Sequence, residues 1–161
     1  IKGKLEHGVI VEPFKHEEFT ASRGDGAKLN GRRIRVSGRA SEVGALYATG
    51  IPFSSPSFDH MDGYLKSMHE FATNSSGVRR MGAAALDLAY VAAGRMDAYW
   101  EMYLKPWDIA AGALLVREAG GMVSDFQGGE KFLETGHIVA CTPKLVKPTL
   151  KVIAKHLSNV K

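Results

Sequence analysis

Hydrophobic and polar residues alternate through the first part of the chain in the pattern of β-strands. Residues 5–13 and 19–22 are expected to form strands, and Pro13 marks the break between them because proline cannot donate to a strand ladder. The Asn30-Gly31 pair predicts a tight hairpin turn, since both turn positions need a positive φ. The first part of the chain is therefore expected to contain strands and a hairpin.

From residue 46 onward, strand-like and helix-like segments alternate. Short apolar runs predict strands at 46–49, 97–101, 122–126 and 138–142, with a short strand or loop at 75–80. Helices are expected at 58–72, 83–93, 106–119 and 143–157. Such alternation is typical of an α/β fold in which helices and a partly parallel sheet pack as a layered sandwich.

The apolar positions of the helices predict which faces are buried. Helix 83–93 is almost entirely alanine, leucine and valine, so it is expected to lie buried between layers. Asp87 in this helix is expected to be a buried, paired carboxylate rather than a catalyst. In helix 58–72, the side chains expected to face the core are Met61, Leu65, Met68 and either Phe71 or Ala72. In helix 106–119 they are Ile109, Ala113 and Val116.

Composition indicates a single domain with a real core, since 45% of the 161 residues are hydrophobic. The single cysteine, Cys141, lies in an apolar run and is expected to be buried; one cysteine allows no internal disulfide, which favours a cytoplasmic location. No apolar stretch is long enough to span a bilayer, so no contact with a membrane is expected.

Basic residues cluster around the predicted hairpin. A solvated hairpin face is the simpler interpretation, and contact with RNA or RNA polymerase is the alternative. Gly24 and Gly26 could suggest a phosphate-binding loop, but a G-x-G pair without a following helix is a weak signal. The basic residues are Arg23, Lys28, Arg32, Arg33, Arg35 and Arg39.

Candidate chemistry gathers in the second half of the chain. Asp108 follows Pro106 at the start of a helix, where a carboxylate can cap the helix or hold a cation. Glu101 ends a predicted strand and is either merely exposed or a hydrogen-bond acceptor. Arg79 and Arg80 could face a phosphate, a partner subunit or solvent. The histidines show no metal-binding spacing, and no motif for covalent catalysis is present.

Residues 77–129, GVRRMGAAALDLAYVAAGRMDAYWEMYLKPWDIAAGALLVREAGGMVSDFQGG, resemble the inositol monophosphatase family. This family comprises Mg²⁺-dependent phosphomonoesterases and includes the bacterial extragenic-suppressor branch. The resemblance implies that Asp108 is a metal ligand that also helps orient the attacking water, and that Glu101 binds inositol hydroxyls. It further implies that the backbone of Gly82, Ala83 and Ala84 approaches the inositol ring. Many members have threonine or serine where this chain has Ala83, so a hydroxyl contact is lost.

The resemblance also implies that this chain is a C-terminal portion. Residues 1–40 would complete an N-terminal sheet, and 41–161 would form a C-terminal α/β subdomain. Roughly a hundred residues would precede Ile1, the bulk of a small domain. The Asp-Pro-Leu-Asp-Gly-Thr motif and the Glu-Glu pair that supply most family metal ligands would lie there. The chain alone is therefore expected to be inactive.

The expected function of the intact protein is Mg²⁺-dependent hydrolysis of a phosphate monoester, in particular myo-inositol monophosphate. Family members are usually homodimers, so a homodimer is expected. One alternative is a non-catalytic interaction module of the extragenic-suppressor type that contacts RNA polymerase, an antitermination factor or RNA. Another is a phosphatase for sugar bisphosphates or 3′-phosphonucleotides, against which Glu101 argues because a carboxylate acceptor suits a polyol.

Overall fold

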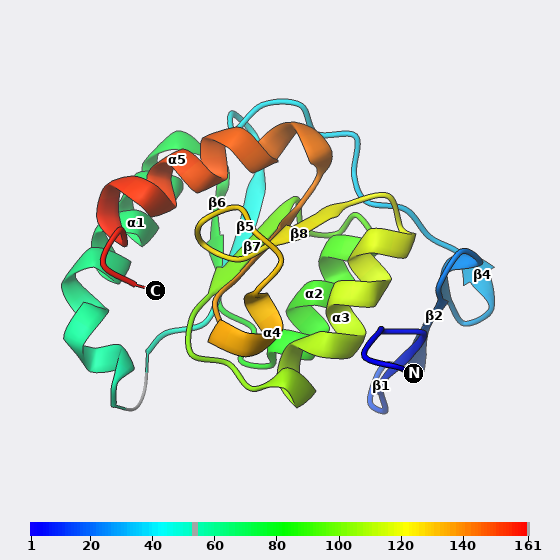
Figure 1. Ribbon diagram of the computed structural model, residues 1–161. Helices are drawn as coiled ribbons and strands as arrows, with labels where there is room; N and C mark the ends of the chain where they lie inside the picture. Colours follow the sequence, from blue (N-terminus) through cyan, green and yellow to red (C-terminus); the bar gives the residue numbers. More distant parts are fainter. Residues whose placement is uncertain (53–54, 161) are drawn as a thin grey trace.

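The computed structural model describes residues 1–52 and 55–160. Its layers alternate between sheets and helices (Figure 1). An antiparallel sheet of β1–β4 lies against the helices α2 and α3, which pack on one face of a second sheet, and the helices α1 and α5 cover the other face of that sheet. The predicted α/β layered fold is confirmed.

The first sheet has the order β1-β2-β3-β4. Ile10 of β1 pairs with Phe19 of β2, and both side chains are buried toward α3, whereas Val9 points outward and is exposed. The turn between β3 and β4 has φ of 48° at Asn30 and 75° at Gly31, as the Asn-Gly pair predicts. The strands are β1 His7–Glu12, β2 Glu17–Ser22, β3 Gly26–Leu29 and β4 Arg32–Arg33.

The second sheet has the order β6-β5-β7-β9-β8. Strand β5 pairs in parallel with both β6 and β7, and β9 pairs antiparallel with β7 and β8. The sheet is therefore partly parallel, as expected from the alternation of strands and helices. Its strands are β5 Leu46–Thr49, β6 Gly77–Arg79, β7 Ala98–Glu101, β8 Met122–Ser124 and β9 Ile138–Cys141.

Helices α2 (Ala84–Ala92) and α3 (Pro106–Glu118) fill the space between the two sheets. All residues of α2 from Asp87 onward are buried, which confirms the prediction made from its apolar composition. In α3 the predicted inward residues Ile109, Ala113 and Val116 are all buried. These helices and the inner faces of both sheets form the larger hydrophobic core.

Helix α1 (Met61–Asn74), which follows a short 3₁₀ turn at Ser57–His60, packs beside α5 (Val146–His156), which follows another at Pro143–Leu145. The predicted inward position of Leu65 is wrong, because this side chain is 47% exposed. The predicted inward position of Phe71 is confirmed, and Tyr64 takes a core position that was not predicted. Phe71 stacks on Tyr47, and the rings of Tyr64 and Phe71 both lie against Trp100. The aromatic packing turns the helix away from the orientation that its aliphatic residues suggest.

Two further details differ from expectation. Strand β8 ends at Ser124, because Asp125 starts a loop in which its carboxylate accepts the backbone N–H groups of Gln127, Gly129 and Lys131. The short helix α4 (Phe132–Thr135) was not expected. Cys141 is buried as expected, and burial raises the pKa of its thiol to about 12. No helix in the described part of the chain is long and apolar enough to cross a membrane.

The G-x-G loop of the first hairpin binds a carboxylate of the protein itself. Glu118, at the end of α3, accepts hydrogen bonds from the N–H groups of Gly24 and Gly26, both at 2.9 Å. The loop donors that could have held a phosphate are therefore used to dock the hairpin on α3. The structure favours the β-hairpin interpretation of this loop.

Half of the basic cluster is paired with acidic residues. Arg23 lies 3.2 Å from Glu6 and Lys28 lies 2.8 Å from Asp25, while Arg39 makes only a long contact with Asp97. The other three arginines are Arg32, Arg33 and Arg35, all exposed. This arrangement is compatible with a solvated face, and it leaves contact with an anionic partner open.

Replacing Glu118 with alanine is expected to lower the free energy of unfolding by about 1–3 kcal/mol, because two backbone donors lose a charged acceptor. Urea unfolding of the variant provides the measurement. Glu134→Ala is the matched control, since Glu134 is exposed and its side chain has no partner in the described residues; its change should stay within about 0.5 kcal/mol. Equal stability of both variants would show that the hairpin docks by other contacts.

Candidate functional site

A hollow of about 350 Å³ brings together Asp108, Glu101 and the backbone from Gly82 to Ala84, the residues to which the family resemblance gives catalytic or binding roles. Arg80 also lines it, whereas Arg79 does not. The hollow lies where the parallel strands β5 and β7 end and where helices α2 and α3 begin. The carboxyl ends of parallel strands commonly form ligand sites in α/β proteins. The lining residues are Gly50, Ile51, Arg80, Gly82, Ala83, Ala84, Glu101, Leu104 and Asp108.

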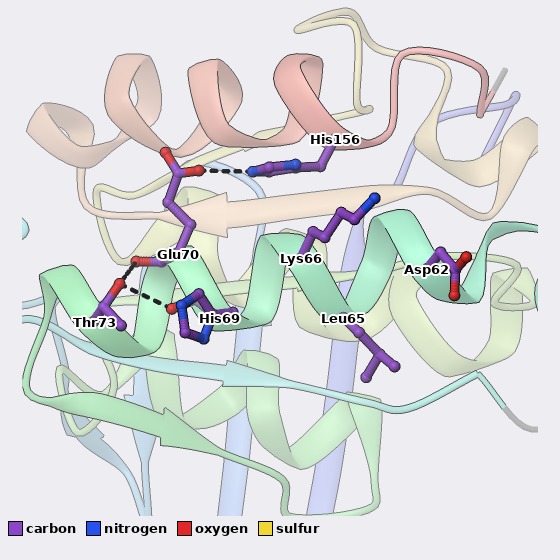
Figure 2. A pocket seen from close by; sticks show the side chains of 7 residues that line it. All are labelled: Asp62, Leu65, Lys66, His69, Glu70, Thr73 and His156. Atoms are coloured by element: carbon purple, nitrogen blue, oxygen red, sulfur yellow. Dashed lines mark hydrogen bonds and ion pairs between the residues drawn. The ribbon is translucent and has the colours of Figure 1, made fainter.

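A hollow of about 560 Å³ lies elsewhere, between α1 and α5 (Figure 2). Glu70 crosses from α1 and accepts from the His156 ring at 2.6 Å and from Lys155 at 2.7 Å. These contacts join the two helices. None of the predicted site residues lies there.

Glu101 is a buried acceptor at the wall of the first hollow. Its residue is only 9% exposed, so the alternative of a merely exposed strand-end glutamate is wrong. The hydroxyl of Tyr99 donates to Oε2 at 2.5 Å, and the backbone N–H of Gly50 also hydrogen-bonds the carboxylate. A side chain at position 50 would collide with the Glu101 carboxylate, which explains a glycine at the end of β5.

The pKa of Glu101 is raised above its ordinary value, chiefly because burial disfavours the charged form. The hydrogen bond from Tyr99 and the positive charge of Arg80 oppose this effect, whereas the nearby Asp108 carboxylate adds to it. Burial also raises the pKa of the Tyr99 hydroxyl well above its usual range, so this hydroxyl remains a donor. Hydrogen bonds from Tyr99 and Gly50 thus fix the orientation of the Glu101 carboxylate in a buried environment.

Asp87 lies in α2 next to Glu101 and is 1% exposed. Its Oδ1 atom has no hydrogen-bond partner among residues 1–52 and 55–160, so the expected pairing is absent for this oxygen. The pKa of Asp87 is raised to about 7, chiefly by burial and also by the charge of Glu101, while the charge of Arg80 lowers it in part. The protonation of Asp87 and that of Glu101 therefore depend on each other and on the charge of Arg80.

Asp108 combines two of the predicted properties. It is the third residue of α3, and its Oδ2 accepts the backbone N–H of Lys105 at 2.9 Å, so it caps the helix. Its Oδ1 accepts no hydrogen bond from the described residues. The carboxylate can therefore cap the helix with one oxygen and present the other to the hollow.

The start of α2 supplies backbone rather than side-chain chemistry. Ala83 occupies the N-cap position in an extended conformation and offers no side chain to cap the helix. The first N–H groups of such a helix lack intrahelical partners and attract anions or hydroxyl oxygens. With Gly82 and Ala84 also lining the hollow, the chain backbone is accessible to a ligand here.

Sequence reasoning missed five lining or supporting residues, one of which is Ile51 in the wall of the hollow. The sequence assigns no definite role to Arg80, whereas the structure places it at the hollow, where its charge acts on the carboxyl groups of Asp87 and Glu101. Gly50 and Leu104 carry no signal in the sequence that links them to the site. Tyr99 could have been found, because residues two apart in a strand share a face and Tyr99 precedes Glu101 by two.

The donor set fits a hard cation only in part. Asp108 offers a carboxylate oxygen, the ligand type that Mg²⁺ prefers. However, the described residues include no group of three or more His, Cys, Asp or Glu side chains that could hold a metal ion. Asp108 can therefore serve as one ligand, and this chain does not form a complete site from its described residues.

Comparison with known proteins agrees with this geometry. A model of the inositol monophosphatase family matches residues 1–160. The chain belongs to this family. The Nus factor SuhB of Pseudomonas aeruginosa is 59% identical over 156 residues, which make up 97% of this chain and 58% of that protein.

Solved structures of the family share this fold. The extragenic suppressor protein suhB from Bartonella henselae matches with a TM-score of 0.91 and 44% identity over 97% of this chain and 59% of that chain. The inositol monophosphatase from Anabaena matches with a TM-score of 0.89 and 36% identity over 99% and 66%, respectively. The chain thus spans little more than half the length of the curated SuhB relative from Pseudomonas aeruginosa.

Replacing Asp87 with asparagine should alter how stability depends on pH. The pKa of Asp87 is about 7 in the folded protein and 3.8 in an ordinary aspartate, so the folded state holds the proton more tightly than the unfolded chain. The wild-type protein therefore loses free energy of unfolding as the pH rises from about 4 to 7. The stability of the variant relative to the wild type should rise from pH 4 to 7 by at most about 4 kcal/mol and then level off. Urea unfolding at several pH values measures this difference, and a difference independent of pH would contradict the prediction.

Proposed function

We propose that the intact protein hydrolyses a phosphate monoester, with myo-inositol monophosphate as substrate and Mg²⁺ as cofactor. The observation that carries this proposal is the hollow that joins the Glu101 acceptor, the backbone at the start of α2 and the Asp108 carboxylate. A polyol offers hydroxyl donors around its ring, which suits the buried Glu101 carboxylate. The solved inositol monophosphatase from Anabaena supports the reaction class.

Each residue has a distinct role in this proposal. Glu101, held by Tyr99 and Gly50, accepts hydrogen bonds from substrate hydroxyls, while the backbone from Gly82 to Ala84 contacts the ring. Asp108 would hold the cation with one oxygen and would help to orient the attacking water. When bound, Mg²⁺ supplies polarisation of the phosphoryl group and lowers the pKa of a bound water.

The remaining metal ligands would come from the part of the family domain that this chain does not span. Residues 1–40 would complete a sheet of that part, and 41–161 would form the C-terminal subdomain. The 161-residue chain alone is therefore proposed to be inactive, because Asp108 alone cannot hold a hard cation that dehydrates reluctantly. The intact protein would be a cytoplasmic homodimer.

A second function is favoured by the names of its relatives. The protein from Pseudomonas aeruginosa, 59% identical, is called a Nus factor, which suggests contact with the transcription machinery. Exposed Arg32 and Arg33 offer a surface for such a partner. Salt-sensitive binding to a transcription factor or RNA that survives loss of Asp108 would favour this module. Sugar bisphosphates or 3′-phosphonucleotides remain alternative substrates, although Glu101 argues against them.

In the intact protein, Asp108→Asn is expected to reduce turnover about 100-fold or more while leaving the fold intact. Asparagine keeps an oxygen that can accept the Lys105 N–H, but it removes the charge that a cation requires. Phosphate release from inositol monophosphate at saturating Mg²⁺ measures turnover, and thermal unfolding checks the fold. A well-folded variant with near-native turnover would show that Asp108 is only a helix cap.

Glu101→Gln is expected to affect natural and artificial substrates differently. For inositol monophosphate, kcat/KM should fall by the equivalent of about 1–3 kcal/mol, the scale of a hydrogen bond to a charged group. Hydrolysis of an aryl phosphate should change much less, because that substrate has no matching hydroxyls. Steady-state kinetics with both substrates provides the test. Equal losses would place Glu101 in the metal site or the fold rather than in substrate recognition.

A further inference from the structure

The segment between Glu101 and Asp108 determines where both carboxylates lie. It leaves β7 after Glu101, passes through Tyr103 and Leu104, and enters α3 at Pro106. Leu104 itself lines the hollow between them. Any change in the path of this short segment would move two sides of the site relative to each other.

Tyr103 has a backbone conformation that needs external support. Its φ is 61°, in the left-handed region that residues other than glycine seldom adopt. Such a conformation persists when surrounding contacts enforce it, and it is often found at functional sites. The positive φ of Tyr103 therefore depends on the residues that contact it.

The residues just before β9 provide these contacts. The backbone N–H of Tyr103 donates to Nδ1 of His137 at 3.2 Å, and the next N–H, of Leu104, donates to the carbonyl of Gly136 at 2.9 Å. The ring of Tyr103 meets the His137 ring edge-on at 4.7 Å and stacks on His60 at 5.9 Å. These contacts extend the β7–β9 ladder beyond its last pair, Glu101 and Ile138.

His137 is well placed to hold this segment. It is 1% exposed, its ring stacks on Phe126 at 5.4 Å, and its backbone N–H donates to Thr135 Oγ1. Gly136 has a φ of 73°, and a side chain there would collide with the backbone of Leu104. Because an N–H donates to Nδ1, the neutral ring carries its proton on Nε2.

We propose that His137 is a positioning residue that fixes the Tyr103 turn through Nδ1 and thereby sets the placement of Glu101 relative to Asp108. It acts on the reaction through these two residues and does not itself line the hollow. The expected effect on catalysis rests on the proposed phosphatase function. The expected protection of the Tyr103 amide from hydrogen exchange is independent of that function.

Two variants of the intact protein whose side chains resemble each other in shape distinguish the effect of the hydrogen-bond acceptor from the effect of side-chain volume. In His137→Asn, Oδ1 occupies the same bond distance from the backbone as Nδ1 and can still accept the Tyr103 N–H. His137→Leu has a similar shape but offers no acceptor. A third variant, His137→Gln, places its acceptor one bond further out.

For the asparagine variant, we expect kcat for inositol monophosphate within about threefold of wild type. The leucine variant should lose about 10- to 100-fold in kcat, the effect of misplacing reacting groups by about 1 Å. The glutamine variant should fall between them. Amide hydrogen exchange by NMR should show Tyr103 protected in the wild type and the asparagine variant and exposed in the leucine variant.

The outcomes decide between the alternatives. A folded leucine variant with wild-type kcat would overturn the positioning role, as would equal losses in the asparagine and leucine variants. Rapid exchange of the Tyr103 amide in the wild type would overturn the hydrogen bond on which the proposal depends. If neither the wild-type protein nor any variant releases phosphate, the proposed function is wrong. In that case, crystal structures of the two variants decide the positioning role, which is overturned if residues 102–105 keep their path without the acceptor.

Discussion

Burial of β7 on both faces is the constraint on which the rest of the structure depends. Because side chains alternate along a strand, Tyr99 enters the core formed with α2 and α3, whereas Ala98 and Trp100 enter the core formed with α1 and α5. Glu101 follows on the same side as Tyr99 and therefore points toward the start of α2. The alternation that joins the two cores thus also directs the acidic group into the hollow.

The same burial makes the site electrostatically costly. Glu101 and Asp87 are both buried carboxyl groups with raised pKa values; each has the other's negative charge or potential charge nearby, and Arg80 partly offsets it. Unpaired polar atoms inside a protein reduce stability, as Asp87 Oδ1 does here. Proteins commonly retain such costs where binding or catalysis uses them. The remainder of α2, which is almost entirely apolar, packs well enough to tolerate this one acidic position.

Local patterns predicted those features of the fold and site that local physics determines. The Asn30-Gly31 turn, the buried α2 and the capping role of Asp108 each follow from a few neighbouring residues. The buried face of α1 was predicted only in part: Phe71 faces the core as expected, but Tyr64 replaces Leu65 because its ring packs on Trp100, which is distant in sequence. Gly50 escaped notice for the same reason, since only the approach of Glu101 across β5 and β7 gives it a role. The Tyr103 turn likewise depends on residues more than thirty positions away.

The distribution of groups around the hollow suggests that different parts of the family domain bind the substrate alcohol and the metal. Among the described residues, the hollow combines hydrogen-bond acceptors and helix N-termini, which would suit the alcohol part of the proposed substrate, with a single carboxylate, that of Asp108, proposed to hold a cation. Recognition of the alcohol and assembly of the metal site would then reside in different parts of the protein. Under this division, changes at Ala83, Glu101 or Tyr103 could alter substrate choice without altering the metal ligands. Such separation would let relatives that share this fold differ in function.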